Sequence, residues 1–109
     1  MTVGVDLGPT SRRVIAVFVA RAGEPLPDNA SVARELHVSE PHLRRLLANE
    51  STTLGRLRAR HNAALAVEAL RRGEPIEMLA LRLGYAEPRG FRRAFRRWTG
   101  MAPSEVRAA

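Results

Sequence analysis

The sequence predicts an all-α fold made of two helix-turn-helix units joined by one long helix. The first observation is an internal repeat: segments that begin at Ala33 and Ala80 match in spacing with an offset of 47 residues. Each has a small alanine where two helices would cross and a turn residue four positions later. The second observation is an amphipathic pattern from Pro88 to Thr99, with rings on one face and arginines on the other. The third is a long helical pattern between the repeats.

The N-terminal segment allows more than one interpretation. Residues 14–19 are rich in β-branched side chains and have strand propensity. Residues 3–11 resemble the phosphate-binding turn of actin-like sugar kinases, although Pro9 replaces a glycine that such a turn favours. That two-domain fold needs a far longer chain, so we expect residues 1–10 to form a tail. Pro25 and Pro27 end whatever element precedes them.

The first predicted unit has a supporting helix followed by a recognition helix. The supporting helix has an inner face made of Val32, Ala33 and Leu36. His37 occupies the turn, and histidine enters the left-handed region more readily than most residues. Ser39 is placed to cap the recognition helix, expected over residues 40–48. Its inward residues are Leu43, Leu46 and Leu47, and its outward residues are Pro41, Arg44, Arg45 and Ala48.

The helix between the repeats is expected over residues 54–72. Thr52 or Thr53 would cap its start, and Gly73 with Pro75 would end it. Such a helix would hold the two units at a fixed separation. We expect its arginines to be solvated: Arg56, Arg58, Arg60, Arg71 and Arg72.

The second predicted unit repeats this plan and adds the most polarised helix of the chain. Its supporting helix has an inner face of Ile76, Leu79, Ala80 and Leu83. Gly84 tolerates positive φ at the turn. In the recognition helix, one side gathers Phe91, Ala94, Phe95 and Trp98. The opposite side gathers Arg89, Arg93 and Arg96, with Arg92 beside them. A last short helix is expected over residues 103–107.

Composition narrows the function classes. The net charge is +7 and all 18 basic residues are arginine, which suggests a polyanionic partner. The chain has no cysteine, no signal-peptide pattern and no apolar run long enough to span a membrane, so we expect a cytoplasmic location and no membrane partner. The three histidines lack metal-ligand spacing, and no nucleophile–base constellation is present. We therefore expect no metal, no cofactor and no catalysis.

The second unit resembles the signature of the AraC/XylS family of bacterial transcription regulators. The residues that carry the resemblance are Gly84, Tyr85, Phe91, Arg93, Ala94, Phe95, Arg96, Arg97, Trp98, Gly100, Pro103 and Arg107. The match extends from Val14 to Arg107. It implies a domain of about seven helices, with a first helix over residues 11–22. It also implies that two recognition helices dock in successive major grooves on one face of double-stranded DNA.

The resemblance also assigns candidate DNA contacts. Base-reading positions align with Pro41, Arg44 and Arg45 in the first recognition helix and with Arg89, Arg92 and Arg93 in the second. Arg96 shares the arginine face, and arginine suits both phosphates and the guanine edge. His42 is expected to contact phosphate. Further phosphate contacts are expected at Ser39, Thr53 and Arg97.

The sequence thus predicts sequence-specific DNA binding for transcription regulation. The expected division is a tail (1–10), a first subdomain (11–53), a linker helix (54–73) and a second subdomain (74–109). Expected partners are RNA polymerase and an N-terminal sensing or dimerisation domain that does not fit in this chain. One alternative is an arginine-rich helical module that binds an acidic partner. A second is a nucleotide-binding fragment that uses Gly4 to Ser11.

Overall fold

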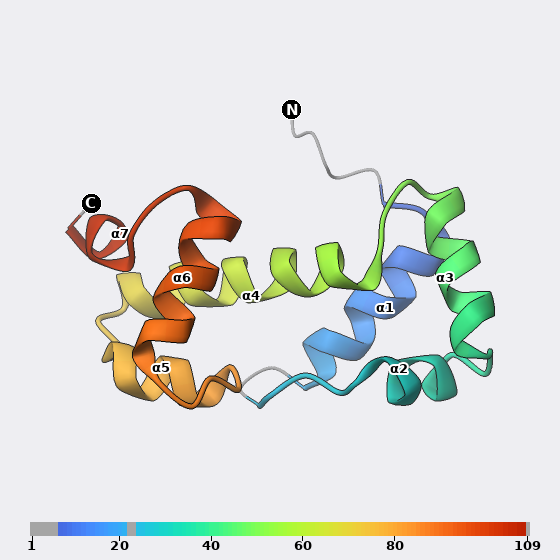
Figure 1. The fold of residues 1–109 in the computed structure, drawn as a ribbon, viewed down its shortest axis with the longest axis horizontal. Helices are drawn as coiled ribbons and strands as arrows, with labels where there is room; N and C mark the ends of the chain where they lie inside the picture. Colours follow the sequence, from blue (N-terminus) through green and yellow to red (C-terminus); the bar gives the residue numbers. More distant parts are fainter. Residues whose placement is uncertain (1–6, 22–23, 109) are drawn as a thin grey trace. The chain divides into compact units, whose positions relative to one another are not determined.

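The computed structural model describes residues 7–21 and 24–108, and these form helices connected by short turns (Figure 1). The described part contains seven helices and no strand, so the predicted all-α fold is confirmed. The helices are α1 (Pro9–Ala20), α2 (Asn29–Glu35), α3 (Glu40–Asn49), α4 (Leu54–Arg71), α5 (Ile76–Arg82), α6 (Pro88–Thr99) and α7 (Pro103–Ala108).

The chain divides into two compact units, and the division falls inside α4. Of the described residues, the first unit holds 7–21 and 27–58, and the second holds 24–26 and 59–108. Of the four parts expected from the sequence, the linker helix is shared between these two units. Its first turn packs in one unit and the remainder packs in the other.

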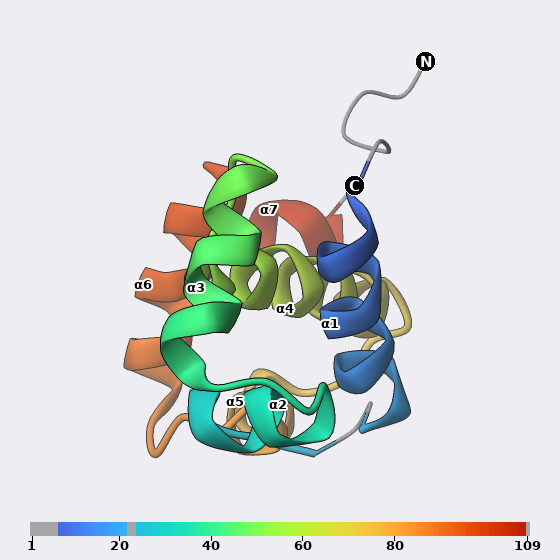
Figure 2. The ribbon, with the colours of Figure 1, turned by 90° about the vertical axis from the view of Figure 1, so that its right-hand side faces the viewer.

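The first unit is a three-helix arrangement of α1, α2 and α3, closed by the start of α4 (Figure 2). Its core consists of Val14, Val17, Phe18, Val32, Ala33, Leu36, Leu43, Leu47 and Leu57. Residues 14–19 form part of α1 despite their strand propensity. Val14, Val17 and Phe18 recur at helical spacing, and as a helix they all face this core. The helix spans Pro9–Ala20, which is two residues earlier at its start than the resemblance implies.

Glu50 supplies the cap that α1 lacks locally. The N-cap residue is Gly8, which has no side chain that could cap the helix. Instead, the Glu50 carboxylate accepts hydrogen bonds from the Thr10 backbone N–H at 2.9 Å, the Ser11 backbone N–H at 2.8 Å and the Ser11 hydroxyl at 2.6 Å. A negative charge at a helix N-terminus also interacts favourably with the helix dipole. Glu50 thereby joins the end of α3 to the start of α1.

Gly8 leaves the space that the Glu50 side chain occupies in this arrangement. A Cβ atom on Gly8 would lie 2.3 Å from Glu50 Cδ, so any side chain there would push the carboxylate away. This arrangement bears on the nucleotide-binding alternative. Residues 3–6 of that motif lie outside the described residues. In the remainder of the motif, the anion at the helix start is a carboxylate of the chain itself, which argues against a nucleotide phosphate at that place.

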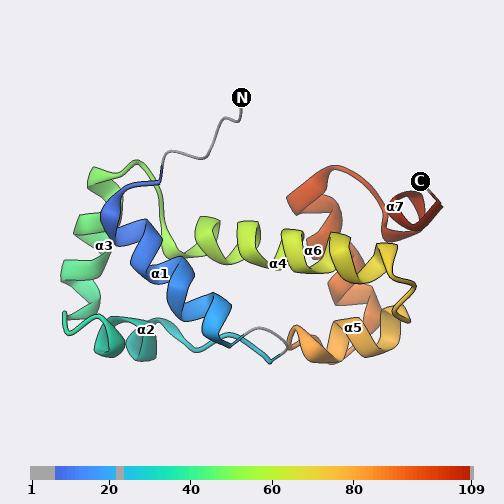
Figure 3. The same ribbon diagram turned by 180° about the vertical axis from the view of Figure 1, so that it is seen from behind.

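The second unit packs α5, α6 and α7 around the later turns of α4 (Figure 3). Its core cluster contains Ala66, Ala69, Leu70, Leu79, Ala80, Leu83, Phe91, Phe95 and Val106. Residues Leu65, Val67, Ile76, Tyr85 and Trp98 are partly buried against it. Every helix of the unit contributes to this cluster, so the position of α6 depends on all of its neighbours.

The turns of the two units have the same backbone form. His37 and Gly84, which stand 47 positions apart, adopt φ values of 61° and 92°. Both predictions of a left-handed turn residue are therefore confirmed. After the turn, the backbone N–H of Val38 bonds the Ala33 carbonyl at 3.1 Å, and that of Tyr85 bonds the Ala80 carbonyl at 2.8 Å. The sequence repeat is thus a structural repeat.

We predict that Glu50→Ala lowers the free energy of unfolding by roughly 1–3 kcal/mol at neutral pH, because it removes hydrogen bonds to a charged acceptor. Burial alone would raise the pKa of the Glu50 carboxyl, but hydrogen bonds from Ser11 and Thr10 outweigh burial and lower it. A lowered folded-state pKa stabilises the fold above the ordinary carboxyl pKa. This stabilisation is lost as the pH falls through the folded-state pKa.

Urea unfolding at a series of pH values measures both effects. The difference between the wild type and Glu50→Ala should shrink as the solution is acidified. The matched control is Glu77→Ala, which removes an exposed carboxylate on α5. Equal losses from the two substitutions, or a difference that grows in acid, would contradict the capping role of Glu50.

Candidate nucleic-acid interface

The helix α6 separates its rings from its charges. Phe91, Ala94 and Phe95 have no exposed surface. The Phe91 ring lies 5.7 Å from the Phe95 ring and 6.3 Å from the Trp98 ring, centroid to centroid. Tyr85 adds an edge contact with Phe91 at 6.1 Å. The predicted ring face is therefore confirmed as core, with Trp98 half-buried at its margin.

The other face of α6 is a stripe of arginines. Arg89, Arg92, Arg93 and Arg96 recur at the spacing i, i+3, i+4 and i+7, and all four side chains are exposed. Arg97, also exposed, stands beside this stripe. The helix contains no acidic residue. Like charges so close together repel one another, so the stripe is a costly surface unless an anion neutralises it.

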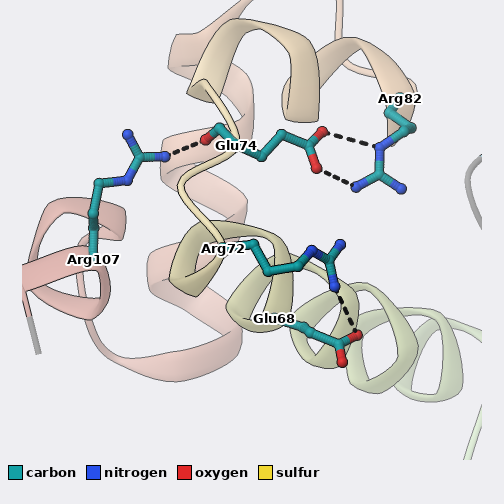
Figure 4. Close-up of polar contacts among 5 residues, drawn as sticks. All are labelled: Glu68, Arg72, Glu74, Arg82 and Arg107. Carbon is teal, nitrogen blue, oxygen red and sulfur yellow. Dashed lines mark hydrogen bonds and ion pairs between the residues drawn. The ribbon is translucent and has the colours of Figure 1, made fainter.

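Among the described residues, the arginines of α6 have no ion-pair or hydrogen-bond partner, whereas several arginines elsewhere are bonded within the chain. Across residues 7–21 and 24–108, no guanidinium group of α6 forms a hydrogen bond or ion pair with another side chain. By contrast, Arg21 pairs with Glu35, and Arg82 pairs with Glu74 at 2.8 Å. Figure 4 shows three bonded arginines of the second unit: Arg72 and Arg82 contact carboxylates, and Arg107 contacts the backbone carbonyl of Glu74. The donors of α6 therefore remain available for a ligand.

The ends of α6 are set by backbone chemistry. Pro88 opens the helix at a position where its missing N–H costs nothing. Gly100 closes it with a φ of 76°, and its backbone N–H bonds the Arg96 carbonyl at 2.8 Å. The Thr99 hydroxyl donates to the Phe95 carbonyl at 2.9 Å. These ends fix the length of the arginine stripe.

The corresponding helix of the first unit is α3, and it carries a weaker positive face. Leu43 and Leu47 are buried and Leu46 is half-buried. The predicted outward residues are exposed, namely Pro41, Arg44, Arg45 and Ala48, and so is His42. A nitrogen of the Arg45 guanidinium lies 3.4 Å from His42 Nδ1. Glu40 at the start of α3 and Glu87 at the start of α6 are 47 positions apart, so the weaker charge of α3 comes from its two arginines against the five of α6.

Two hydroxyl groups cap helices at this interface, as the sequence predicts. The Ser39 hydroxyl accepts a hydrogen bond from the His42 backbone N–H at 3.2 Å and caps α3. The Thr53 hydroxyl accepts from the Arg56 backbone N–H at 3.1 Å at the start of α4. Each cap uses the oxygen as an acceptor, which leaves the hydroxyl hydrogen free to bond an anion.

The prediction that all arginines of the long helix are solvated is wrong for Arg58. Its guanidinium carbon lies 5.5 Å from the centre of the Phe18 ring, and one of its nitrogens donates to Asn29 Oδ1 at 2.6 Å. Burial lowers the pKa of this guanidinium. Arg58 therefore belongs to the packing of the first unit. No local pattern indicates this, because the partners lie 29 or more residues away in the chain.

Within the described residues, no helix has both the length and the apolar character needed to cross a bilayer.

Comparisons with known proteins give the same fold and family. The profile of a family described as a helix-turn-helix domain matches residues 32–109. The ornithine utilization regulator of Pseudomonas aeruginosa is 41% identical over 98 residues, which cover 89% of this chain and 29% of that protein. The chain therefore spans less than a third of the length of this relative.

Solved structures extend the comparison to three dimensions. The transcriptional regulator CdpR from Pseudomonas aeruginosa superposes with a TM-score of 0.87 and 38% identity, over 94% of this chain and 33% of that one. A DNA-binding transcriptional dual regulator from Escherichia coli K-12 has a TM-score of 0.82 and 25% identity, over 93% of this chain and 97% of that one. With a family match over most of its length, the chain belongs to the family of AraC-type helix-turn-helix domains.

Proposed function

We propose that this chain binds double-stranded DNA in a sequence-specific manner and thereby regulates transcription, with α3 and α6 as its two recognition helices. Family membership and the named relatives support sequence-specific DNA binding for transcription regulation. The major groove of B-DNA is about 12 Å wide and admits an α-helix. Two different recognition helices in one chain would read two boxes about one helical turn apart, on the order of 10 bp.

The observation that carries this proposal is the construction of α6. Phe91, Ala94 and Phe95 on its apolar face are fully buried, so its arginine stripe has one fixed orientation. The arginines of this helix have no acidic partner in the described chain, so they meet DNA without first breaking an ion pair. A solubilising surface alone would not require unpaired arginines to gather on the second helix of a helix-turn-helix.

We assign the residue roles by chemistry. Arg89, Arg92 and Arg93 would read bases from α6, because the guanidinium fork fits the O6 and N7 acceptors of guanine. Arg44 and Arg45 would do the same from α3, where Pro41 offers an apolar contact. Phosphates would be held by His42, Arg96, Arg97, Ser39 and Thr53, and these contacts fix register without reading sequence.

The wider biological context is part of the same proposal. We infer contact with RNA polymerase, action in the cytoplasm where bacterial DNA lies, and a sensing or dimerisation domain in the complete regulator. The greater length of the relatives is consistent with such a domain. The relatives are named as regulators, which supports a binding role over a catalytic one.

Arg93→Ala should weaken binding to the preferred DNA site by about 1–3 kcal/mol and relax the preference for one base pair in the second box. The matched control is Arg97→Ala, since both side chains are exposed arginines of α6. Loss of Arg97 should weaken binding to all duplexes by a similar factor. Titration against a set of singly substituted duplexes separates the two. A uniform loss from Arg93→Ala would remove its assignment as a base reader.

The affinity should also depend steeply on salt. If about 5–8 phosphates are neutralised, the logarithm of the association constant falls with the logarithm of salt concentration at a slope of about −5 to −7. Arg97→Ala should reduce the magnitude of this slope by about 1. Titrations between low and near-physiological salt measure it. A slope near zero would show that phosphate contacts contribute little and would count against the proposal.

A further inference from the structure

Glu74 connects three helices of the second unit. It lies in the turn between α4 and α5. Its carboxylate accepts hydrogen bonds from Arg82 in the last turn of α5, from Nε at 3.1 Å and from Nη2 at 2.8 Å (Figure 4). Its backbone carbonyl accepts a hydrogen bond from Arg107 of α7. Glu74 alone therefore bonds both α5, the next helix, and α7, the last helix of the fold.

The pair of Glu74 and Arg82 differs from an ordinary surface ion pair. Both side chains are largely shielded, with exposed fractions of 22% and 25%, and the arginine uses two parallel donors. The nearby pair of Glu68 and Arg72 is 60–69% exposed and joins through one contact at 3.6 Å. A bidentate pair fixes a direction as well as a distance. An exposed single contact contributes little.

The orientation of α5 affects that of the recognition helix α6, because the two helices share a core. Leu79, Ala80 and Leu83 of α5 lie in the same core cluster as Phe91 and Phe95 of α6. The tight turn between the helices is closed by the hydrogen bond from Tyr85 to Ala80. Apolar packing is non-directional by itself. The two hydrogen bonds from Arg82 to Glu74 are a directional contact that holds α5 against the turn after α4.

The first unit also has an ion pair at the end of its supporting helix, with the charges reversed. Arg21, the residue after α1, pairs with Glu35, the last residue of α2. Glu35 precedes Arg82 by 47 positions, which is the offset of the structural repeat, whereas Arg21 precedes Glu74 by 53 positions. Both units therefore bond the last turn of the supporting helix to a residue of opposite charge just past the preceding helix. The polarity is opposite and the pair of the second unit is bidentate, so what recurs is an ion pair at the end of the supporting helix and not the same residues or geometry.

We propose that Glu74 and Arg82 are positioning residues for DNA recognition, since they fix the angle at which α5 presents α6 and its arginine stripe. Neither residue would touch DNA. The inference rests on the proposed function, because it concerns how that same surface is held. It predicts that the pair controls sequence preference more than overall attraction to DNA.

The test exploits the opposite charges of the pair. Glu74→Ala makes the chain more positive and Arg82→Ala makes it less positive. Affinity is measured for a duplex that the wild-type chain enriches from a random library and for a scrambled duplex of the same composition. Both variants should lose roughly threefold to tenfold on the enriched duplex. On the scrambled duplex, Glu74→Ala should bind slightly tighter and Arg82→Ala slightly weaker, following charge alone.

Three controls complete the design. The double variant should lose no more than either single variant, because one interaction is removed in each case. Glu68→Ala and Arg72→Ala should follow charge on both duplexes. Arg82→Lys keeps the charge but cannot form the bidentate contact with Glu74. It should therefore recover only part of the affinity that Arg82→Ala loses on the enriched duplex. Circular dichroism and thermal unfolding establish that each variant is folded at the temperature of the binding assay.

The outcomes separate the two proposals. If the wild type enriches a sequence and the two alanine variants shift affinity in opposite directions on both duplexes, the pair acts only through charge and positioning is overturned. If both variants keep the wild-type preference, positioning is likewise overturned while the proposed function stands. If the wild type enriches no sequence at all, the proposed function fails and the positioning role fails with it.

Discussion

Burial of Phe91 and Phe95 fixes the rotation of α6 about its own axis, and the remainder of the second unit depends on that constraint. Both rings have no exposed surface and lie among residues from α4, α5 and α7. Turning the helix would bring them into water at a cost of about 1.5–3 kcal/mol for each ring. The arginines therefore face outward because the rings face inward. The hydrophobic core determines where the positive charge lies.

The two units achieve similar geometry with different residues. A histidine in one and a glycine in the other adopt the left-handed turn, at His37 and Gly84. The supporting helices are tied by ion pairs of opposite polarity, Arg21 with Glu35 and Glu74 with Arg82. The charge on their recognition helices is unequal, since α6 has five arginines and α3 has two, while one glutamate stands at the start of each, Glu87 and Glu40. We expect α6 to contribute more of the electrostatic attraction to DNA.

Much of the fold follows from local patterns in the sequence. Helical periodicity locates α4 and α6 to within a residue or two, and turn chemistry at His37 and Gly84 predicts the backbone found there. The first helix is less certain from sequence, because residues 14–19 favour a strand by propensity. Burial of Val14 and Phe18 and the cap from Glu50 decide in favour of a helix.

The contacts that sequence reasoning misses join residues distant in the chain. Glu50 caps a helix 39 residues away, Arg58 bonds a residue 29 positions away, and Arg107 reaches a carbonyl 33 positions away. No periodicity or spacing reports such pairs. Exposure of the candidate site residues is predictable from the helical wheel and agrees with the structure. Their individual roles at DNA are proposals, because each role depends on contacts with bound DNA.

The most direct measurement is a selection of bound double-stranded DNA from a random library at near-physiological salt, performed with the wild type and with Arg93→Ala. A reader with two recognition helices should enrich a motif of two boxes, and the substitution in α6 should remove information from the second box only. Binding that is sensitive to salt but enriches no motif would contradict sequence-specific recognition. It would reduce the arginine stripe to a general polyanion surface.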